Sequence, residues 1–212
     1  MRYFVRTTGE RTIDESLSQI KYELLVDKEH NARKSFVEQL EYLATLGEDV
    51  VILEDDIILC KNFEQRIEEV ISKYEDKVIN FFYNPTYWYQ YYFTYSFNWN
   101  QCVYYSKEIL PELSKAMREA YTQHPNVPHD DLEGYVLSKL KIRTCIPRPC
   151  LVQHIDKDTL IQEYKCGNRR TPYFIDYLEE LNISYEDAYK PENKQKLIDL
   201  MNKKFENYSL IK

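Results

Sequence analysis

Three consecutive acids, Glu54, Asp55 and Asp56, directly follow the apolar run 50–53. That run is continuous rather than alternating, which predicts a central strand covered on both faces. Carboxylates at the end of such a strand repel one another and lose hydration, so they favour a cationic partner. Hard oxygen ligands at this edge of an open α/β sheet suit Mg²⁺ or Mn²⁺. The alternative is a solvated turn whose acids cap a helix.

Two segments carry a resemblance to a known family. The run 50–57, Val-Val-Ile-Leu-Glu-Asp-Asp-Ile, followed by Asn62 and Phe63, looks like the Asp-x-Asp-type metal site of GT-A glycosyltransferases in a hydrophobic-Glu-Asp-Asp form. The run 149–155, Pro-Cys-Leu-Val-Gln-His-Ile, resembles the C-terminal histidine segment that completes the metal shell in several such families. The resemblance extends over roughly residues 2–175, with these two segments as its most specific parts.

The resemblance implies a role for each of these residues. Asp56 would bind the metal directly, Asp55 would hold ribose or sugar hydroxyls of the donor, and Glu54 would support the strand end. His154 would supply the remaining protein ligand, which favours Mn²⁺ slightly over Mg²⁺ because imidazole prefers softer cations. The alternative for His154 is a hydrogen-bonded core residue beside Gln153.

A further acidic segment, 129–131, looks like the one that holds the catalytic base in this fold, and residues 98–106 resemble the acceptor-side strand before it. An inverting transfer needs a base that takes the proton from the attacking hydroxyl, and Asp131 or Asp130 is the candidate. If both are instead caps or surface charges, a retaining mechanism stays open.

Polar residues near other expected strand ends are candidates for holding the donor. GT-A proteins hold the nucleotide after their first two strands and at the start of the next helix, and a guanidinium can bind phosphate through two hydrogen bonds. The candidates are Arg6, Thr7, Thr8, Arg11, Asp27, Arg33, Arg169 and Arg170. For the last two, on a segment that we expect to close over the donor, a solvated basic turn is the alternative.

Residues 87–99 hold nine aromatic side chains in thirteen positions. Tyr and Trp rings stack on sugar faces and on nucleobases, so Tyr87, Trp88 and Trp99 are candidates for an acceptor platform. A tyrosine-rich core edge or an oligomer contact is the alternative.

These residues need a scaffold of alternating strands and helices. Strands are expected at 2–7, 22–26, 50–53, 78–83, 102–105 and 142–146, and helices near 32–43, 63–74, 109–120 and 130–140. Asn62 and Gln65 have capping-box spacing, and Asp130 is a candidate cap. The order predicts an α/β fold, and the resemblance specifies the GT-A (Rossmann-like) form, with a mostly parallel central sheet flanked by helices and a helical C-terminal tail.

The expected organisation is one catalytic unit over 1–171 and a helical appendage over 172–212. Within the first, 1–60 would form the nucleotide and metal half and 78–155 the acceptor and catalytic half. The chain has only four glycines among 212 residues, which excludes a Gly-rich phosphate loop. Any diphosphate must therefore be held by a metal and side chains.

Composition narrows the class of protein. No apolar run is long enough for a membrane span, and we expect a cytoplasmic protein whose five scattered cysteines are reduced thiols. A net charge of −7 argues against a polyanionic partner. The oligomeric state stays open.

The function predicted from these features is a metal-dependent glycosyltransferase of hexosyltransferase type. It would move a sugar from a nucleotide-sugar, with a UDP-sugar favoured, to a hydroxyl of a glycan, a protein side chain, a small molecule or a modified nucleobase. The alternatives are a metal-dependent nucleotidyl or phosphoryl transferase and a non-catalytic carbohydrate-binding protein of the same fold.

Overall fold

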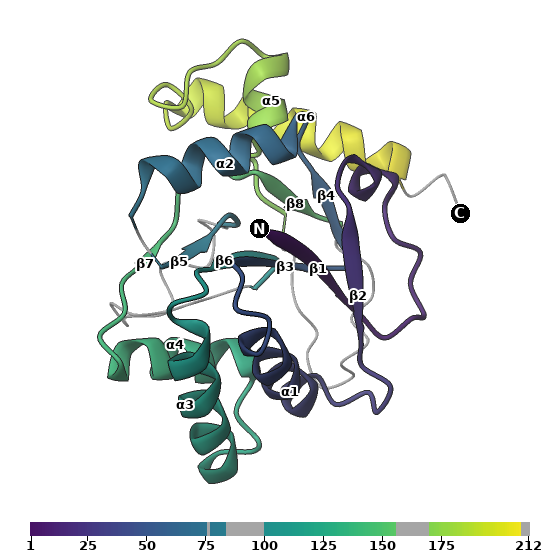
Figure 1. The fold of residues 1–212 in the computed structure, drawn as a ribbon. Coiled ribbons are helices and arrows are strands. Elements are labelled where there is room, and N and C mark those ends of the chain that lie inside the picture. Colours follow the sequence, from purple (N-terminus) through teal and green to yellow (C-terminus); the bar gives the residue numbers. More distant parts are fainter. Residues whose placement is uncertain (76, 84–99, 156–169, 209–212) are drawn as a thin grey trace.

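The computed structural model describes residues 1–75, 77–83, 100–155 and 170–208. Figure 1 shows a central sheet with helices on both sides. The strands are β1 (Arg2–Thr7), β2 (Tyr22–Val26), β3 (Val50–Glu54), β4 (Ile57–Leu59), β5 (Val78–Asn80), β6 (Cys102–Tyr105), β7 (Thr144–Cys145) and β8 (Val152–His154). The helices are the 3₁₀ helix η1 (Glu15–Gln19) and the α-helices α1 (Ala32–Ala44), α2 (Phe63–Lys73), α3 (Leu110–Gln123), α4 (His129–Lys139), α5 (Ile175–Glu180) and α6 (Pro191–Tyr208).

The larger sheet of the described residues has the strand order β2-β1-β3-β6-β5-β7. β1 pairs in parallel with β2 and β3, and β5 pairs in parallel with β7. β6 runs antiparallel to both of its neighbours, β3 and β5. The predicted α/β fold with a mostly parallel sheet is therefore confirmed. β4 and β8 form a separate antiparallel pair in which Ile57 faces His154.

The central strand β3 is buried on both faces, as its apolar run predicts. Val51 and Leu53 belong to one hydrophobic core, and Val50 and Ile52 belong to a second core. Helices α2, α5 and α6 cover the first core and α1, α3 and α4 cover the second, on opposite sides of the sheet (Figure 1). The acidic residues at the end of β3 are thus carried by a strand that two layers of helices hold in place.

Two expected helix caps are wrong. Asn62 precedes α2 but has a φ of 56° and makes no side-chain cap hydrogen bond, so it forms no capping box with Gln65. Asp130 lies inside the first turn of α4, because Pro128 occupies the N-cap position and α4 begins at His129. The N-terminus of α1 does have a side-chain cap, since Asn31 Oδ1 accepts from Lys34 N at 3.1 Å.

Two expected strands are shorter than the sequence pattern suggests. β5 ends at Asn80, whose side-chain Oδ1 accepts a hydrogen bond of 3.0 Å from Phe82 N and so turns the chain. β7 is reduced to Thr144–Cys145 at the sheet edge. By contrast, β1, β2 and β6 have the predicted bounds.

The C-terminal helices belong to a core rather than lying apart from it. Tyr177 and Leu178 of α5 and Leu197, Met201 and Phe205 of α6 are each at most 5% exposed and pack in the core shared with β1 and β3. The division of the chain at residue 171 stays a prediction. Among the helices of the described residues, none has the length and hydropathy that a bilayer span requires.

Candidate functional site

The acidic turn (Glu54, Asp55 and Asp56) joins β3 to β4, with Asp55 and Asp56 as the two residues between the strands. Because β4 pairs with β8, this turn lies against the end of β8, where Ile155 N donates to the carbonyl oxygen of Asp56 at 2.8 Å. The pairing places His154 Nε2 at 3.4 Å from Asp56 Oδ2. Two residues far apart in sequence therefore meet at the site.

Arg11 brings a positive charge into the acidic turn. Its Nη1 lies 3.2 Å from Asp55 Oδ1 and 2.6 Å from Asp56 Oδ2. The side chains of Arg11, Asp55 and Asp56 are only 14%, 6% and 10% exposed, so this contact is shielded from water. Asp55 Oδ2 is buried without a hydrogen-bond partner among the described residues.

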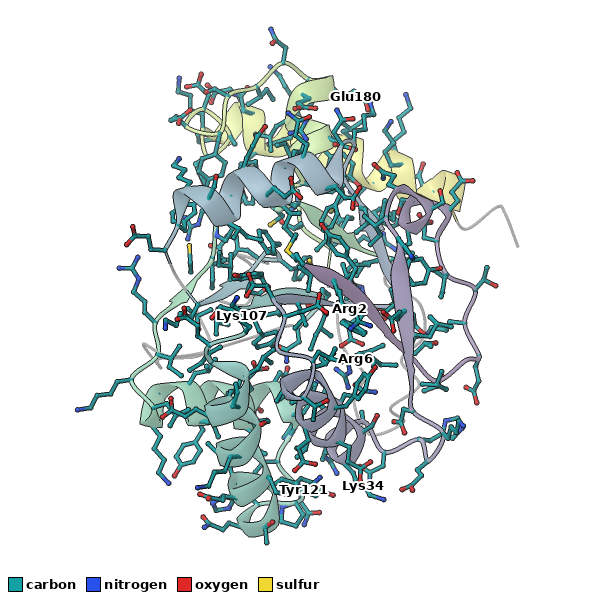
Figure 2. The ribbon with its side chains drawn as sticks, in the orientation of Figure 1. Arg2, Arg6, Lys34, Lys107, Tyr121 and Glu180 are labelled. Carbon is teal, nitrogen blue, oxygen red and sulfur yellow. The ribbon has the colours of Figure 1, made fainter. Side chains whose placement is uncertain are left out.

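Arg6 connects the acidic turn to α1 and to the start of α4. Its Nη1 lies 2.6 Å from Glu54 Oε1 and its Nε donates to Gln39 Oε1 of α1 at 2.8 Å. The same Nη1 lies 3.1 Å from His129 Nε2, and Nη2 donates to Ala32 O at 3.3 Å. Figure 2 shows Arg6 in the space between β1 and α1. Arg6 thereby fixes Glu54 against α1 and the start of α4.

Partial burial and the neighbouring charges set the pKa of Glu54 and the pKa of His129. Desolvation, with the nearby charges of Asp56 and Asp55, raises the pKa of Glu54 to about 7, and Arg6 opposes the rise. Desolvation lowers the pKa of His129 well below its ordinary value, and the positive charges of Arg6 and Arg33 add to the effect. A guanidinium can only donate, so Nε2 of a neutral His129 accepts from Arg6 and its proton is assigned to Nδ1.

The two aspartates that follow His129 differ in setting. Asp130 Oδ1 accepts a hydrogen bond of 3.1 Å from Asp131 N, within the first turn of α4. Asp131 is an exposed residue, and partial desolvation raises the pKa of its carboxyl group. A raised pKa brings a carboxylate closer to what a general base needs at neutral pH.

Glu133 is a buried acid that is not among the residues predicted from the sequence. It has no exposed surface, and its two carboxyl oxygens accept hydrogen bonds of 2.7 Å from Tyr105 Oη and Asn100 Nδ2. Desolvation raises the pKa of Glu133 to about 8. Its position next to Leu132 and before Val136 on the apolar face of α4 was the signal available in the sequence.

Gln153 is a second residue whose role the sequence did not reveal. Its Oε1 accepts from the backbone N–H groups of Thr171 at 2.9 Å and His154 at 3.0 Å, and its Nε2 donates to Thr171 O at 2.7 Å. The amide group therefore joins the end of β8 to the chain that returns at residue 170. Beside it, the guanidinium of Arg170 lies 4.0 Å from the ring centre of Phe205 in α6.

The remaining donor candidates lie around the ends of β1 and β2. Thr7 Oγ1 accepts from Gly9 N at 2.9 Å, and Asp27 Oδ1 accepts from Glu29 N at 3.2 Å, so each supports its own loop. Thr8 and Arg33 are partly buried near the same edge. Four candidates lie outside the described residues, namely Arg169, Tyr87, Trp88 and Trp99.

Two solved structures are similar to the chain. The chain is similar to A197 from STIV, with 16% identity, a TM-score of 0.46 and coverage of 72% of this chain and 84% of that chain. It is also similar to a glycosyltransferase involved in the glycosylation of the major capsid of PBCV-1, with 14% identity and a TM-score of 0.50. The match covers 74% of this chain and 94% of that chain. No curated protein sequence matches the chain.

The family comparison covers the candidate site itself. The model of glycosyltransferase family 25 (LPS biosynthesis protein) matches residues 39–161. That range includes the acidic turn, the start of α4 and His154, and the α/β architecture around them is GT-A-like. The chain belongs to glycosyltransferase family 25.

Proposed function

We propose that this glycosyltransferase takes its sugar from a nucleotide-sugar, with a UDP-sugar favoured, and uses Mn²⁺ or Mg²⁺ held by Asp56 and His154. The observation that carries the proposal is the 3.4 Å approach of His154 Nε2 to Asp56 Oδ2 at the end of the buried strand β3. Carboxylate and imidazole are a ligand pair suited to Mn²⁺.

The residues present fit such a cation. Asp55 Oδ2 is a buried oxygen without a partner among the described residues, and Arg11 already shows that a positive group is accepted between Asp55 and Asp56. The described part of the chain contains no group of three or more His, Cys, Asp or Glu ligands. Two protein ligands suit a metal that takes its other ligands from donor phosphates and water. When bound, the metal supplies charge neutralisation for the departing nucleoside diphosphate.

The chain's own side chains supply the remaining functions. Asp55 offers Oδ2 as an acceptor for a ribose or sugar hydroxyl, and Arg6 keeps Glu54 fixed behind it. Asp131, with its raised pKa, takes the proton of the acceptor hydroxyl in an inverting transfer, and Asp130 is the alternative base. The acceptor is a glycan, a protein side chain, a small molecule or a modified nucleobase.

A thermal-shift screen of UDP-, GDP-, ADP- and TDP-sugars with and without Mn²⁺ tests the donor and the metal together. We expect a metal-dependent rise in melting temperature with the cognate donor, because a ligand stabilises the state that binds it. Asp56→Asn should lose the rise, and Asp199→Asn on α6 is the matched control that keeps it. The absence of a metal-dependent shift with every donor would overturn the proposal.

The base assignment has its own test. Asp131→Asn should lower kcat by about 10²-fold or more with little change in donor affinity, since a positioned base contributes about 10² to 10⁴-fold. A larger loss in Asp130→Asn would transfer the role to Asp130. The anomeric configuration of the product, followed by NMR, distinguishes inversion from retention. Consumption of a nucleoside triphosphate would instead indicate a nucleotidyl transferase, and sugar binding without turnover would indicate a carbohydrate-binding protein.

A further inference from the structure

The positive group that contacts both aspartates of the acidic turn belongs to the protein itself. Arg11 Nη1 bridges Asp55 Oδ1 at 3.2 Å and Asp56 Oδ2 at 2.6 Å. Arg11 is not on a strand but on residues 8–14, which connect β1 to η1. The contact therefore links the acidic turn to a loop that starts where β1 ends.

The oxygen that Arg11 contacts most closely is also the oxygen nearest to His154. Asp56 Oδ2 lies 2.6 Å from Arg11 Nη1 and 3.4 Å from His154 Nε2. A divalent cation that binds Asp56 must therefore approach a carboxylate already engaged by a guanidinium. Two like charges at one shielded carboxylate repel each other strongly, because little water screens them. The two cations should then compete.

We propose that Arg11 competes with the divalent metal for Asp56 and thereby sets the metal affinity of the site. Metal binding releases Arg11 from Asp56, and the freed guanidinium then binds the phosphates of the donor. The inference rests on the metal site proposed above and adds to it a residue that controls when the site fills.

The charges around the acidic turn support this exchange. Glu54 is paired with Arg6, which leaves Asp55 and Asp56 with Arg11 as the cation between them. Two carboxylates and one guanidinium leave net negative charge, which attracts a further cation. A divalent cation together with these three side chains carries a net positive charge, which complements a diphosphate. Asp55 Oδ2, buried and without a partner among the described residues, provides unused acceptor capacity in the same place.

The geometry of the connecting segment is compatible with movement of Arg11. Gly9 has a φ of 82°, and a Cβ atom built there would meet nothing within 4 Å. The segment is anchored at its two ends, where Gly9 N donates to Thr7 Oγ1 at 2.9 Å and Ser16 N donates to Asp14 Oδ1 at 2.9 Å. Arg11 lies between these anchors with its side chain 14% exposed, so the side chain can change partners while the two ends of the segment stay in place.

Mn²⁺ binding to the protein without donor tests the competition directly. Arg11→Met removes the charge and keeps the side-chain length, so Mn²⁺ affinity, measured by electron paramagnetic resonance, should rise about tenfold or more, as expected when a competing charge is removed. UDP affinity at saturating Mn²⁺ should fall about tenfold, because one phosphate contact is lost. Arg66→Met, which removes a guanidinium paired with Glu179 at 2.6 Å, is the matched control and should change neither value.

Arg11→Lys is a second variant that keeps the charge and should bind Mn²⁺ nearly as the parent protein does. Suppose that Asp56→Asn abolishes Mn²⁺ binding but Arg11→Met leaves the Mn²⁺ affinity unchanged or lowers it. That result would overturn the competition and still support the metal site. If neither the parent nor Arg11→Met binds Mn²⁺, the metal site and the competition fail together.

Discussion

The hydroxyl group of Tyr105 donates a hydrogen bond of 2.7 Å to Oε1 of Glu133, a carboxyl group with no exposed surface. This pair joins the central strand β6 to the helix α4 that carries Asp130 and Asp131. Burial favours the neutral acid, so the pair makes the stability of the fold depend on pH.

The pKa of Glu133 is raised from 4.5 to about 8, which means that the folded state holds its proton more tightly than the unfolded state. The stabilisation is complete below pH 4.5 and is lost as the pH rises to about 8. Glu133→Gln stays neutral, so its unfolding free energy should fall less than that of the parent over this range, as measured by urea unfolding. Glu119→Gln, at an exposed position of α3, should follow the parent curve. Parallel curves for Glu133→Gln and the parent would contradict the prediction.

Replacing Arg6 should destabilise the fold far more than replacing Arg2 on the same strand. Arg6→Met leaves Glu54 without its buried partner, and breaking such a pair costs about 3–5 kcal/mol. Arg2 pairs with Glu23 and Glu48 at the surface, where water screens the charges, so Arg2→Met should cost much less than Arg6→Met. Urea unfolding at pH 8 gives both values. Equal losses would show that Arg6 does not support the acidic turn.

Gln153→Glu should weaken the connection between β8 and residue 171. The carboxylate can still accept from Thr171 N and His154 N, but it cannot donate to Thr171 O, and the loss should cost about 1–3 kcal/mol. Gln195→Glu on the exposed face of α6 is the control; it loses a hydrogen bond to Asp199 and should cost no more than about 0.5 kcal/mol. Thermal unfolding of the parent and the two variants without ligand measures the loss of unfolding free energy in each variant. A smaller loss in Gln153→Glu than in the control would rule out this role.

The C-terminal helix should be needed for a folded catalytic unit. Phe205→Ala removes a buried ring from the core shared with β1 and β3, and the expected cost is about 3–5 kcal/mol. Leu24→Ala, at a side chain that is 51% exposed, should cost less than about 0.5 kcal/mol. A chain that ends at residue 171 should unfold without cooperativity. Full cooperative unfolding of that shortened chain would support a separate appendage instead.

Local patterns in the sequence were sufficient for much of the fold. The bounds of β1, β2 and β6 follow from short apolar or β-branched runs, whose signal depends on neighbouring residues alone. The end of β5 did not follow, because it depends on a side-chain hydrogen bond from Asn80 that no periodicity reveals. The start of α4 likewise depends on Pro128, which displaces Asp130 from the cap position.

For the candidate site, the roles of the predicted residues stay predictions, and many of the contacts between these residues did not follow from the sequence. The pairing of Asp56 with His154 was expected from the resemblance to GT-A enzymes, and the antiparallel pair β4 and β8 provides the physical reason. The contacts of Arg6 with His129 and of Arg11 with Asp56 join segments that lie far apart in the chain. Such contacts depend on how loops and helix ends pack in three dimensions, which composition and spacing do not encode.

The alternation of β3 between two cores has a consequence for how the family can change over time. Val51 and Leu53 have different neighbours from Val50 and Ile52, because the sheet separates the two layers. Substitutions deep in the two layers, more than about 10 Å apart and without shared neighbours, should therefore have nearly additive effects on unfolding free energy. One layer can then diverge in sequence while the other is preserved. In either case β3 keeps the acidic turn in the same position.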